Sequence, residues 1–246
     1  MPGQAPPPPQ PWDPHDPPPP DPLILSAWFE DPDRQAIEAV IKDCGASASW
    51  LEIPDTDWEA QSRVGLRPVQ ISDQLVIAPP WDAPPGALII EPGQGFGTGS
   101  HPTTRQALHA LVRLAPRARS ALDVGTGSGI LALAAARLGL EVRGIDVDPT
   151  AIRDAERHAH LNGLSVAFST TPLDQLDQPA DLVLANLHAE LLVALAPELI
   201  QRTGHALILA GILEDREPLL RARYDPALEL EDRAADGAWI SLVYVR

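Results

Sequence analysis

The sequence has almost none of the residues that build disulfides, thiolate metal sites and basic surfaces. Cys44 is the only cysteine among 246 residues, so neither an internal disulfide nor a cysteine-built metal site can form. Lys42 is the only lysine, and 34 acidic against 18 basic residues give a formal net charge of −16. This charge disfavours non-specific binding of nucleic acid through a basic surface and suits a basic partner. No cluster of His, Asp and Glu suggests a metal.

The sequence also lacks a long apolar run. The candidates "ILALAAARLGL" and "LVLANLHAELLVALA" are too short for a bilayer or contain Arg137, His188 and Glu190. The first residues show no basic segment followed by an apolar core, which a signal peptide would have. We therefore expect no membrane association and a cytoplasmic location.

Prolines gather at the amino terminus, and the composition divides the chain into four segments. Residues 1–22 hold 12 of the 28 prolines, which predicts a disordered, extended tail. Residues 23–54 predict a small strand–helix–strand segment, and residues 55–92 predict a linker with a short helix and strands. Residues 93–246 form the largest predicted domain.

Strands and helices alternate regularly in this last segment. The predicted strands are 120–125, 141–147, 165–170, 181–186, 205–211, 227–234 and 238–245, and the predicted helices are 102–115, 128–139, 149–163, 188–201 and 213–224. Alternation with nearly continuous apolar strands is typical of a parallel α/β sheet covered on both faces. Only the short turn "ADGA" separates the last two strands, so they should pair as an antiparallel hairpin at the edge.

A glycine-rich turn, "LDVGTGSGI", lies where the first of these strands meets a helix. Gly125, Gly127 and Gly129 let a ligand approach the backbone, and Asp146 ends the next strand, where a carboxylate can accept both ribose hydroxyls. This pairing predicts a nucleoside-bearing cofactor. The alternative is tight packing of strand against helix without a ligand.

The spacing of the glycines favours one cofactor over another. A dinucleotide fingerprint has its third glycine one residue later than this turn does. Asp123 precedes the glycines, where its charge would oppose a pyrophosphate but suit an ammonium or sulfonium group. Both features favour S-adenosylmethionine over NAD.

Several motifs, taken in order, resemble one family. They are "FGTGSHPTT", "LDVGTGSGILALAAARLG", "GIDVDPTAI", "LVLANLHAELL" and "LILAGIL". Together with "DTDWEAQSRVGLRPVQI" they resemble the PrmA family, the methyltransferases of ribosomal large-subunit protein eleven, from about Asp55 to Arg246. The resemblance implies a seven-stranded Rossmann-like sheet, mostly parallel with one antiparallel strand near the carboxyl terminus. It also implies S-adenosylmethionine as methyl donor and protein amino groups (lysine side chains, the N-terminal amine or both) as acceptors.

The resemblance assigns roles to individual residues. Gly125, with Gly127 beside it, would contact the methionine half of the donor, and Asp146 its ribose. Thr104 matches the family's donor-contacting threonine. Asn186, which ends "LVLAN", matches the asparagine that faces the methyl group and is the expected catalytic residue.

The loop 93–104, "GQGFGTGSHPTT", is expected to cover the bound donor. Gly97 and Gly99 would allow close approach, and Phe96 would shield the methyl group from water. Pro102 would begin a helix whose amino terminus favours the donor's carboxylate.

Some alternatives stay open at this point. Residues 23–54 are about half of the family's larger amino-terminal domain, so the acceptor could be another protein or a small amine. The chain could also be a non-catalytic donor-binding scaffold. His101 either steers chemistry or caps its helix, and His188 either contacts the acceptor or is structural.

Overall fold

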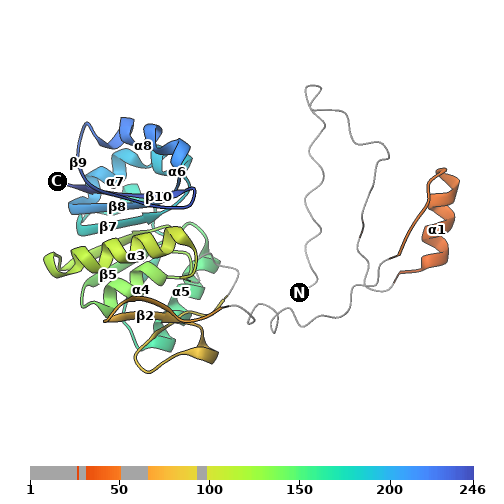
Figure 1. Ribbon diagram of the computed structural model, residues 1–246, viewed down its shortest axis with the longest axis horizontal. Coiled ribbons are helices and arrows are strands. Elements are labelled where there is room, and N and C mark those ends of the chain that lie inside the picture. Colours follow the sequence, from red (N-terminus) through yellow and green to blue (C-terminus); the bar gives the residue numbers. More distant parts are fainter. Residues whose placement is uncertain (1–26, 28–31, 51–65, 93–98) are drawn as a thin grey trace. The chain divides into compact units, whose positions relative to one another are not determined.

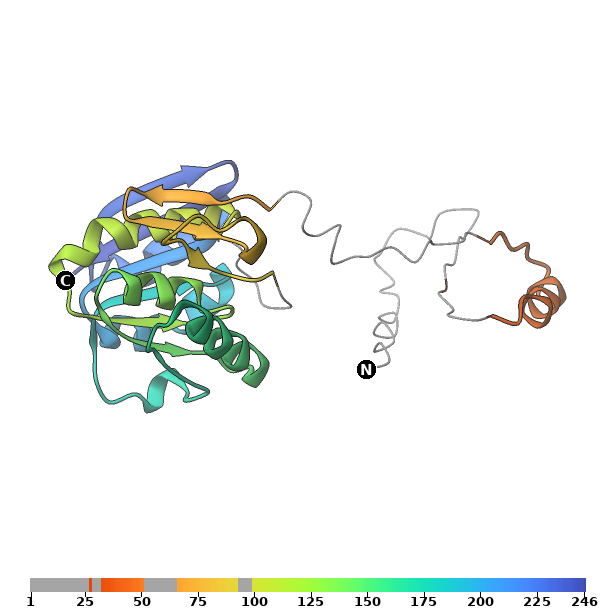
Figure 2. The ribbon, with the colours of Figure 1, turned by 90° about the horizontal axis from the view of Figure 1, so that it is seen from below.

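The structure is a computed structural model that describes residue 27 and residues 32–50, 66–92 and 99–246 (Figures 1 and 2). The chain divides into two units, Met1–Asp55 and Thr56–Arg246. The predicted tail 1–22, the helix expected near 55–65 and the loop residues 93–98 lie outside the described residues.

The described part of the first unit centres on helix α1 (Arg34–Asp43), where the sequence predicts a helix. Asp33 caps its start by accepting a hydrogen bond from the Ala36 amide at 3.1 Å. Trp50 folds back onto the helix, with Nε1 donating to Glu38 at 2.6 Å. The sequence predicts the second strand of this segment over residues 47–53; its first residues, 47–50, are not in a strand, and residues 51–53 lie outside the described residues.

The second unit contains a seven-stranded sheet in the order β6-β5-β4-β7-β8-β10-β9. The strands are β4 (Ser120–Val124), β5 (Glu141–Ile145), β6 (Ala167–Ser169), β7 (Ala180–Asn186), β8 (Thr203–Leu213), β9 (Glu229–Asp236) and β10 (Trp239–Val245). β6, β5, β4, β7 and β8 pair in parallel, and β10 is antiparallel to both of its neighbours. The predicted α/β class and seven-stranded, mostly parallel sheet are confirmed.

The terminal hairpin forms at the edge of the sheet, as predicted, and its first strand is the outermost one. β10 lies between β8 and β9, and β9 takes the outer position. The composition explains this order, because "WISLVYV" is buried over its middle while "ELEDRAAD" is mostly exposed. An apolar strand gains more from two neighbours, and a charged strand is suited to a sheet edge.

Helices cover both faces of this sheet (Figure 1). The helices are α3 (Pro102–Leu114), α4 (Ile130–Arg137), α5 (Pro149–Asn162), α6 (Ala189–Ala194), α7 (Ala196–Arg202) and α8 (Glu217–Tyr224). Leu182 and Leu184 of β7 pack in one core with α3, α4 and α5, while Val183 and Ala185 pack in a second core with α6, α7 and α8. The alternation follows from the two-residue repeat of a strand and gives three layers.

A small second sheet lies against the α3, α4 and α5 layer (Figure 2). It consists of β1 (Val69–Ser72), β2 (Leu75–Ala78) and β3 (Leu88–Ile89), where strands are predicted. Ile71, Leu75, Ile77 and Leu88 are buried in the same core as these helices.

The predicted helix 188–201 is broken into α6 and α7 at Leu195. Pro197 lies in the first turn of α7. Proline has no amide hydrogen to donate to the preceding turn, so it is tolerated at a helix start and disfavoured inside a longer helix.

Candidate active site

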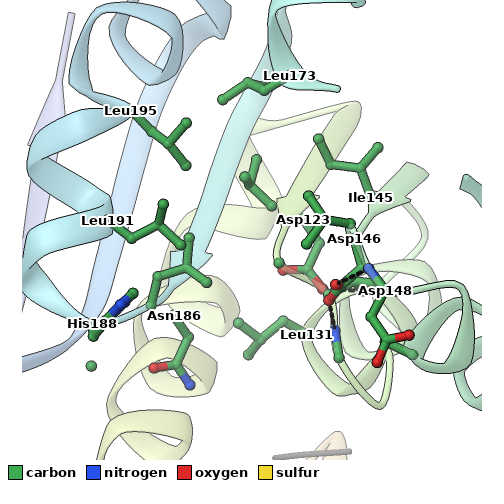
Figure 3. A pocket seen from close by; sticks show the side chains of 18 of the residues that line it. Asp123, Leu131, Ile145, Asp146, Asp148, Leu173, Asn186, His188, Leu191 and Leu195 are labelled. Carbon is green, nitrogen blue, oxygen red and sulfur yellow. Dashed lines mark hydrogen bonds between the residues drawn. The ribbon is translucent and has the colours of Figure 1, made fainter. Parts of the chain in front are cut away.

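A cavity of about 870 Å³ opens at the carboxyl ends of the central strands (Figure 3). Its lining comes from the ends of β4, β5, β7 and β8, the starts of α3, α4 and α5, the segment after β6, helices α6 and α7 and the start of β10. The volume lies within the range of small-molecule sites, and the carboxyl edge of a parallel sheet is where such folds bind ligands.

The glycine-rich turn forms one wall of the cavity. Gly125, Gly127 and Gly129 all have positive φ angles, of 72°, 53° and 81°, which favour glycine. A Cβ on Gly129 would lie 2.9 Å from the Cβ of Ala155 in α5, so the third glycine serves helix packing. Gly125 and Gly127 line the cavity.

Asp146 follows β5 and is oriented by two backbone amides. Gly127 N donates to Asp146 Oδ2 at 2.9 Å, and Asp148 N donates to Oδ1 at 3.0 Å. Each carboxylate oxygen keeps a further lone pair, and the residue is only partly buried. This is the arrangement that a pair of vicinal hydroxyls requires, and it fits the ribose of the expected donor.

Asp123 lies deeper, under the glycine turn. Its Oδ2 accepts from Thr126 Oγ1 at 2.6 Å and from Ala132 N at 3.1 Å. Burial raises the pKa of Asp123 to about 6, against the opposing effect of these hydrogen bonds. A buried carboxylate in the cavity wall favours a cationic ligand, because a positive charge relieves the cost of its burial.

Sequence reasoning missed Val147. It directly follows Asp146 and lines the cavity. It is 90% exposed, more than any other large apolar residue in the described part of the chain. An apolar side chain left in solvent beside the Asp146 carboxylate offers a surface on which a flat base could pack. The signal was present in "GIDVDP", where an apolar residue interrupts two acids.

Thr104 and Asn186 come together from distant parts of the chain. Thr104 is fully buried in the first turn of α3, and Asn186 ends β7. Asn186 Nδ2 donates to Thr104 Oγ1 over 3.4 Å, a long hydrogen bond. With its nitrogen turned to Thr104, the amide keeps its oxygen as an acceptor, and Asn186 lines the cavity.

Gly211, at the end of β8, is a second residue that sequence reasoning missed. Its φ is 82°, and a Cβ there would lie 2.5 Å from Leu187 O and 3.0 Å from Asn186 Oδ1. The absence of a side chain therefore makes room for the Asn186 amide. The motif "LILAGIL" contains this glycine, but a sequence does not show which strand lies beside it.

The two histidines at the cavity differ in role. His101 is the N-cap of α3, with Nδ1 3.4 Å from the Thr103 amide and 2.8 Å from Thr103 Oγ1. His188 precedes α6 but makes no capping hydrogen bond, is exposed and lines the cavity. A capping role therefore explains the position of His101 at the start of its helix, but it does not explain the position of His188.

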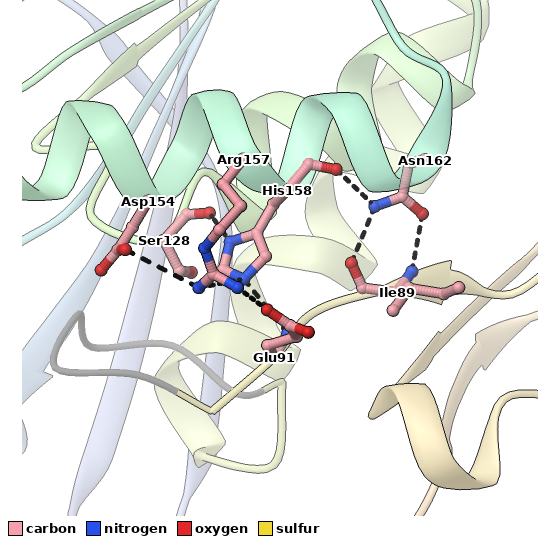
Figure 4. A network of polar contacts seen from close by, with 7 residues as sticks. All are labelled: Ile89, Glu91, Ser128, Asp154, Arg157, His158 and Asn162. Atoms are coloured by element: carbon pink, nitrogen blue, oxygen red, sulfur yellow. Dashed lines mark hydrogen bonds and ion pairs between the residues drawn. The ribbon is translucent and has the colours of Figure 1, made fainter.

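A hydrogen-bond network holds the segment that precedes the expected covering loop, while Phe96 and Gly97 of the loop lie outside the described residues. Glu91 precedes the loop, and its amide donates to the buried His158 Nε2 at 3.1 Å (Figure 4). The other ring nitrogen, Nδ1, lies 2.8 Å from Ser128 O in the glycine turn. Burial lowers the pKa of His158, which favours the neutral ring that can accept from Glu91. The network thus joins Glu91, which lies two residues before the loop, to the glycine turn.

Two absences apply to the described part of the chain. Within it, no three His, Cys, Asp or Glu side chains are arranged to hold a metal ion. None of its helices is long and apolar enough to span a bilayer.

The fold and the site define a Rossmann-like, S-adenosylmethionine-dependent methyltransferase. The family model described as ribosomal protein L11 methyltransferase (PrmA) matches residues 25–246. The chain belongs to this family. The match also takes in residues 25–54, which the motifs quoted above did not reach.

Relatives and solved structures agree with this membership. The ribosomal protein L11 methyltransferase of Thermus thermophilus is 43% identical over 206 residues, 80% of each chain. That of Geobacter sulfurreducens is 46% identical over 225 residues, 85% of this chain and 75% of the relative. The crystal structure of a ribosomal protein L11 methylase from Lactobacillus delbrueckii subsp. bulgaricus is 32% identical, with a TM-score of 0.68 over 73% of this chain and 98% of that one.

Proposed function

We propose that this chain transfers methyl groups from S-adenosylmethionine to amino groups of ribosomal protein L11, including lysine side chains. The observation that carries the proposal is the Asn186 amide, held by Thr104 in the same cavity as Asp146. A nucleoside site and a polar group suited to an amine therefore share one cavity. The acceptor is inferred from the relatives, which are ribosomal protein L11 methyltransferases.

The donor end of the cavity is assigned to four residues. Asp146 accepts the ribose hydroxyls, Val147 packs on the base, and Gly125 and Gly127 border the methionine half. The amino terminus of α3, which begins at Pro102, favours the donor's carboxylate. Phe96 and Gly97 are assigned to the covering loop from the family resemblance alone.

Bound at this site, the donor supplies an electrophilic methyl group on a sulfonium. The chain then has to align the acceptor nitrogen with that methyl and exclude water, which can contribute several kcal/mol (about 7–11 in favourable cases). A lysine has a solution pKa of about 10.4, so only about 0.1% is neutral near pH 7.4. Entry into the cavity lowers that pKa, and Asn186 Oδ1 accepts a hydrogen bond from the neutral amine, turning its lone pair toward the methyl.

The net charge of −16 fits a basic protein as acceptor and disfavours a direct nucleic-acid partner. Long-range attraction of this kind weakens with salt, so acceptor affinity should fall between low and physiological ionic strength. We place the reaction in the cytoplasm with this acceptor, and the donor-binding domain at residues 93–246, preceded by the segments 55–92, 23–54 and 1–22.

The test is incubation of the full chain with labelled donor and purified, unmodified ribosomal protein L11, followed by mass spectrometry of the acceptor. We expect label on amino groups, including lysine. A chain that binds donor but labels neither this protein nor any other in an undermethylated extract would be a scaffold. Label confined to another protein or a small amine would change the identity of the acceptor and leave the methyltransferase activity in place.

A further inference from the structure

The cavity extends beyond the donor end along the sheet. Asp146 and the glycine turn lie at β5 and β4, Asn186 at β7, Gly211 at β8 and Trp239 at the start of β10. The sheet order makes these strands successive neighbours. At about 4.8 Å per strand, β10 lies about 10 Å beyond β7, within reach of an indole directed along the edge.

Trp239 is held in place by α3 and by the sheet. Its backbone pairs with Leu213 of β8 and Asp236 of β9. Gln106 Nε2 donates to Trp239 O at 3.0 Å, and the ring lies edge-to-face with His101, with centroids 5.1 Å apart and planes at 70°. The ring is half-buried and lines the cavity.

The charges along the cavity are unevenly distributed. Among the described residues that line it, carboxylates come from the donor end and the α7 side, namely Asp123, Asp146, Asp148, Asp174 and Glu198. The lining from β8 and β10 contributes Gly211 and Trp239, which carry no charge. A cation at this end meets an aromatic ring instead of a carboxylate.

Resting on the proposed function, we infer that Trp239 is the aromatic wall of the acceptor subsite and binds the cationic amine by a cation–π interaction. In the transfer, the nitrogen lone pair forms the new N–C bond, the C–S bond breaks, and its electron pair stays on sulfur. Positive charge therefore moves from sulfur to nitrogen, which then releases a proton to water. An aromatic ring stabilises this positive charge by about 0.5–2 kcal/mol. A carboxylate in its place would raise the pKa of the amine more strongly and so oppose loss of the proton.

The first test measures binding without turnover. The probes are Nα-acetyl-Nε-trimethyllysine amide and its uncharged isostere with carbon in place of the ammonium nitrogen, each titrated into the full chain with S-adenosylhomocysteine present. The wild-type chain should prefer the cation by roughly 2- to 30-fold. Trp239→Phe should keep part of this preference, and Trp239→Leu should lose it. Trp81→Leu, the same change at an exposed tryptophan outside the cavity lining, should leave it intact.

Equal affinities for the two probes in the wild-type chain, or a preference that survives Trp239→Leu, would overturn the inference. Melting temperatures check that each variant folds, and Trp239→Met supplies a second non-aromatic side chain if the leucine variant does not.

The second test separates this inference from the proposed function. With ribosomal protein L11 as acceptor, Trp239→Leu should raise the acceptor KM several-fold while donor affinity stays within about twofold. A parallel loss of donor affinity would mean that Trp239 supports the whole site, against the inference. If the wild-type chain prefers the cation but does not methylate this acceptor, the proposed function fails and the subsite stands. If the wild-type chain methylates this acceptor but does not prefer the cation, the proposed function stands and the inference about Trp239 fails.

Discussion

The two ends of the cavity are built from different chemistry. At the donor end, the carboxylate of Asp146 is fixed by two backbone amides, and Asp123 lies buried beneath the turn. At the acceptor end, an amide, a hydroxyl and an indole, from Asn186, Thr104 and Trp239, replace the carboxylates. The difference follows from what each ligand must do. The donor keeps its positive charge until transfer, whereas the amine has to lose a proton first, and a nearby carboxylate would raise its pKa.

Asn186→Ala should give the largest effect at the acceptor end. We expect the methylation rate at saturating donor to fall on the order of a hundredfold or more, because one positioning contact of the transition state is lost. Donor affinity should fall less, since Asp146 and the glycine turn remain. Asn186→Asp keeps an oxygen acceptor but adds a charge that favours the protonated amine, so it should not restore full activity. A near-normal rate for the alanine variant would remove Asn186 from the mechanism.

Asp146→Ala should affect the donor end of the cavity and weaken donor binding. It removes a charged acceptor for two hydroxyls, and calorimetry should show donor affinity reduced by about ten- to a hundredfold. Asp177→Ala, at an exposed acid outside the cavity lining, is the matched control and should change nothing. Unchanged donor affinity in the Asp146 variant would mean that the ribose lies elsewhere.

Donor affinity should also depend on pH through Asp123. Its pKa is raised to about 6, so lowering the pH through this value neutralises the carboxylate in the donor-free protein. A cationic donor favours the ionised form, so affinity should rise with pH and be about tenfold weaker near pH 5 than at saturating ionisation. Asp123→Asn, which can still accept from Thr126, should flatten this part of the profile. The same slope in both proteins would assign the titration to another group.

Thr104→Val should give the smallest effect. It replaces a buried hydroxyl by a methyl of similar size and leaves Asn186 Nδ2 without its partner. A hydrogen bond of about 0.5–1.5 kcal/mol corresponds to a two- to tenfold loss of turnover. Donor affinity should change less than turnover. The opposite order, with donor affinity affected most, would show that Thr104 contacts the donor directly, as the family resemblance implies.

The same two ends also differ in how far the sequence predicts them. Gly125, Gly127 and Asp146 belong to short motifs in which a strand end and its turn are adjacent in sequence, so local patterns predict their meeting. The sequence predicts the seven strands and all helices except the break between α6 and α7 for the same reason, since the alternation of apolar residues is a local property.

The acceptor end depends on strand order, which is not local. Gly211 and Trp239 reach the cavity because β8 follows β7 in the sheet and β10 is inserted before β9. The sequence correctly predicts the hairpin at the edge, but it does not show which of the two strands pairs with β8, and the cavity's extension to β10 depends on that. The distance of 82 positions between Thr104 and Asn186 likewise hides their contact until the fold is known.

The most direct measurement is the rate of methyl transfer to ribosomal protein L11 as a function of donor concentration, for the wild-type chain, Asp146→Ala and Asn186→Ala. If donor and acceptor bind at separate ends of the cavity, the two variants should depend differently on donor concentration. Asp146→Ala should approach the wild-type rate once donor is raised about ten- to a hundredfold, whereas Asn186→Ala should stay slow at every donor concentration. Recovery of both variants at high donor, or of neither, would contradict the division of the cavity into a donor end and an acceptor end.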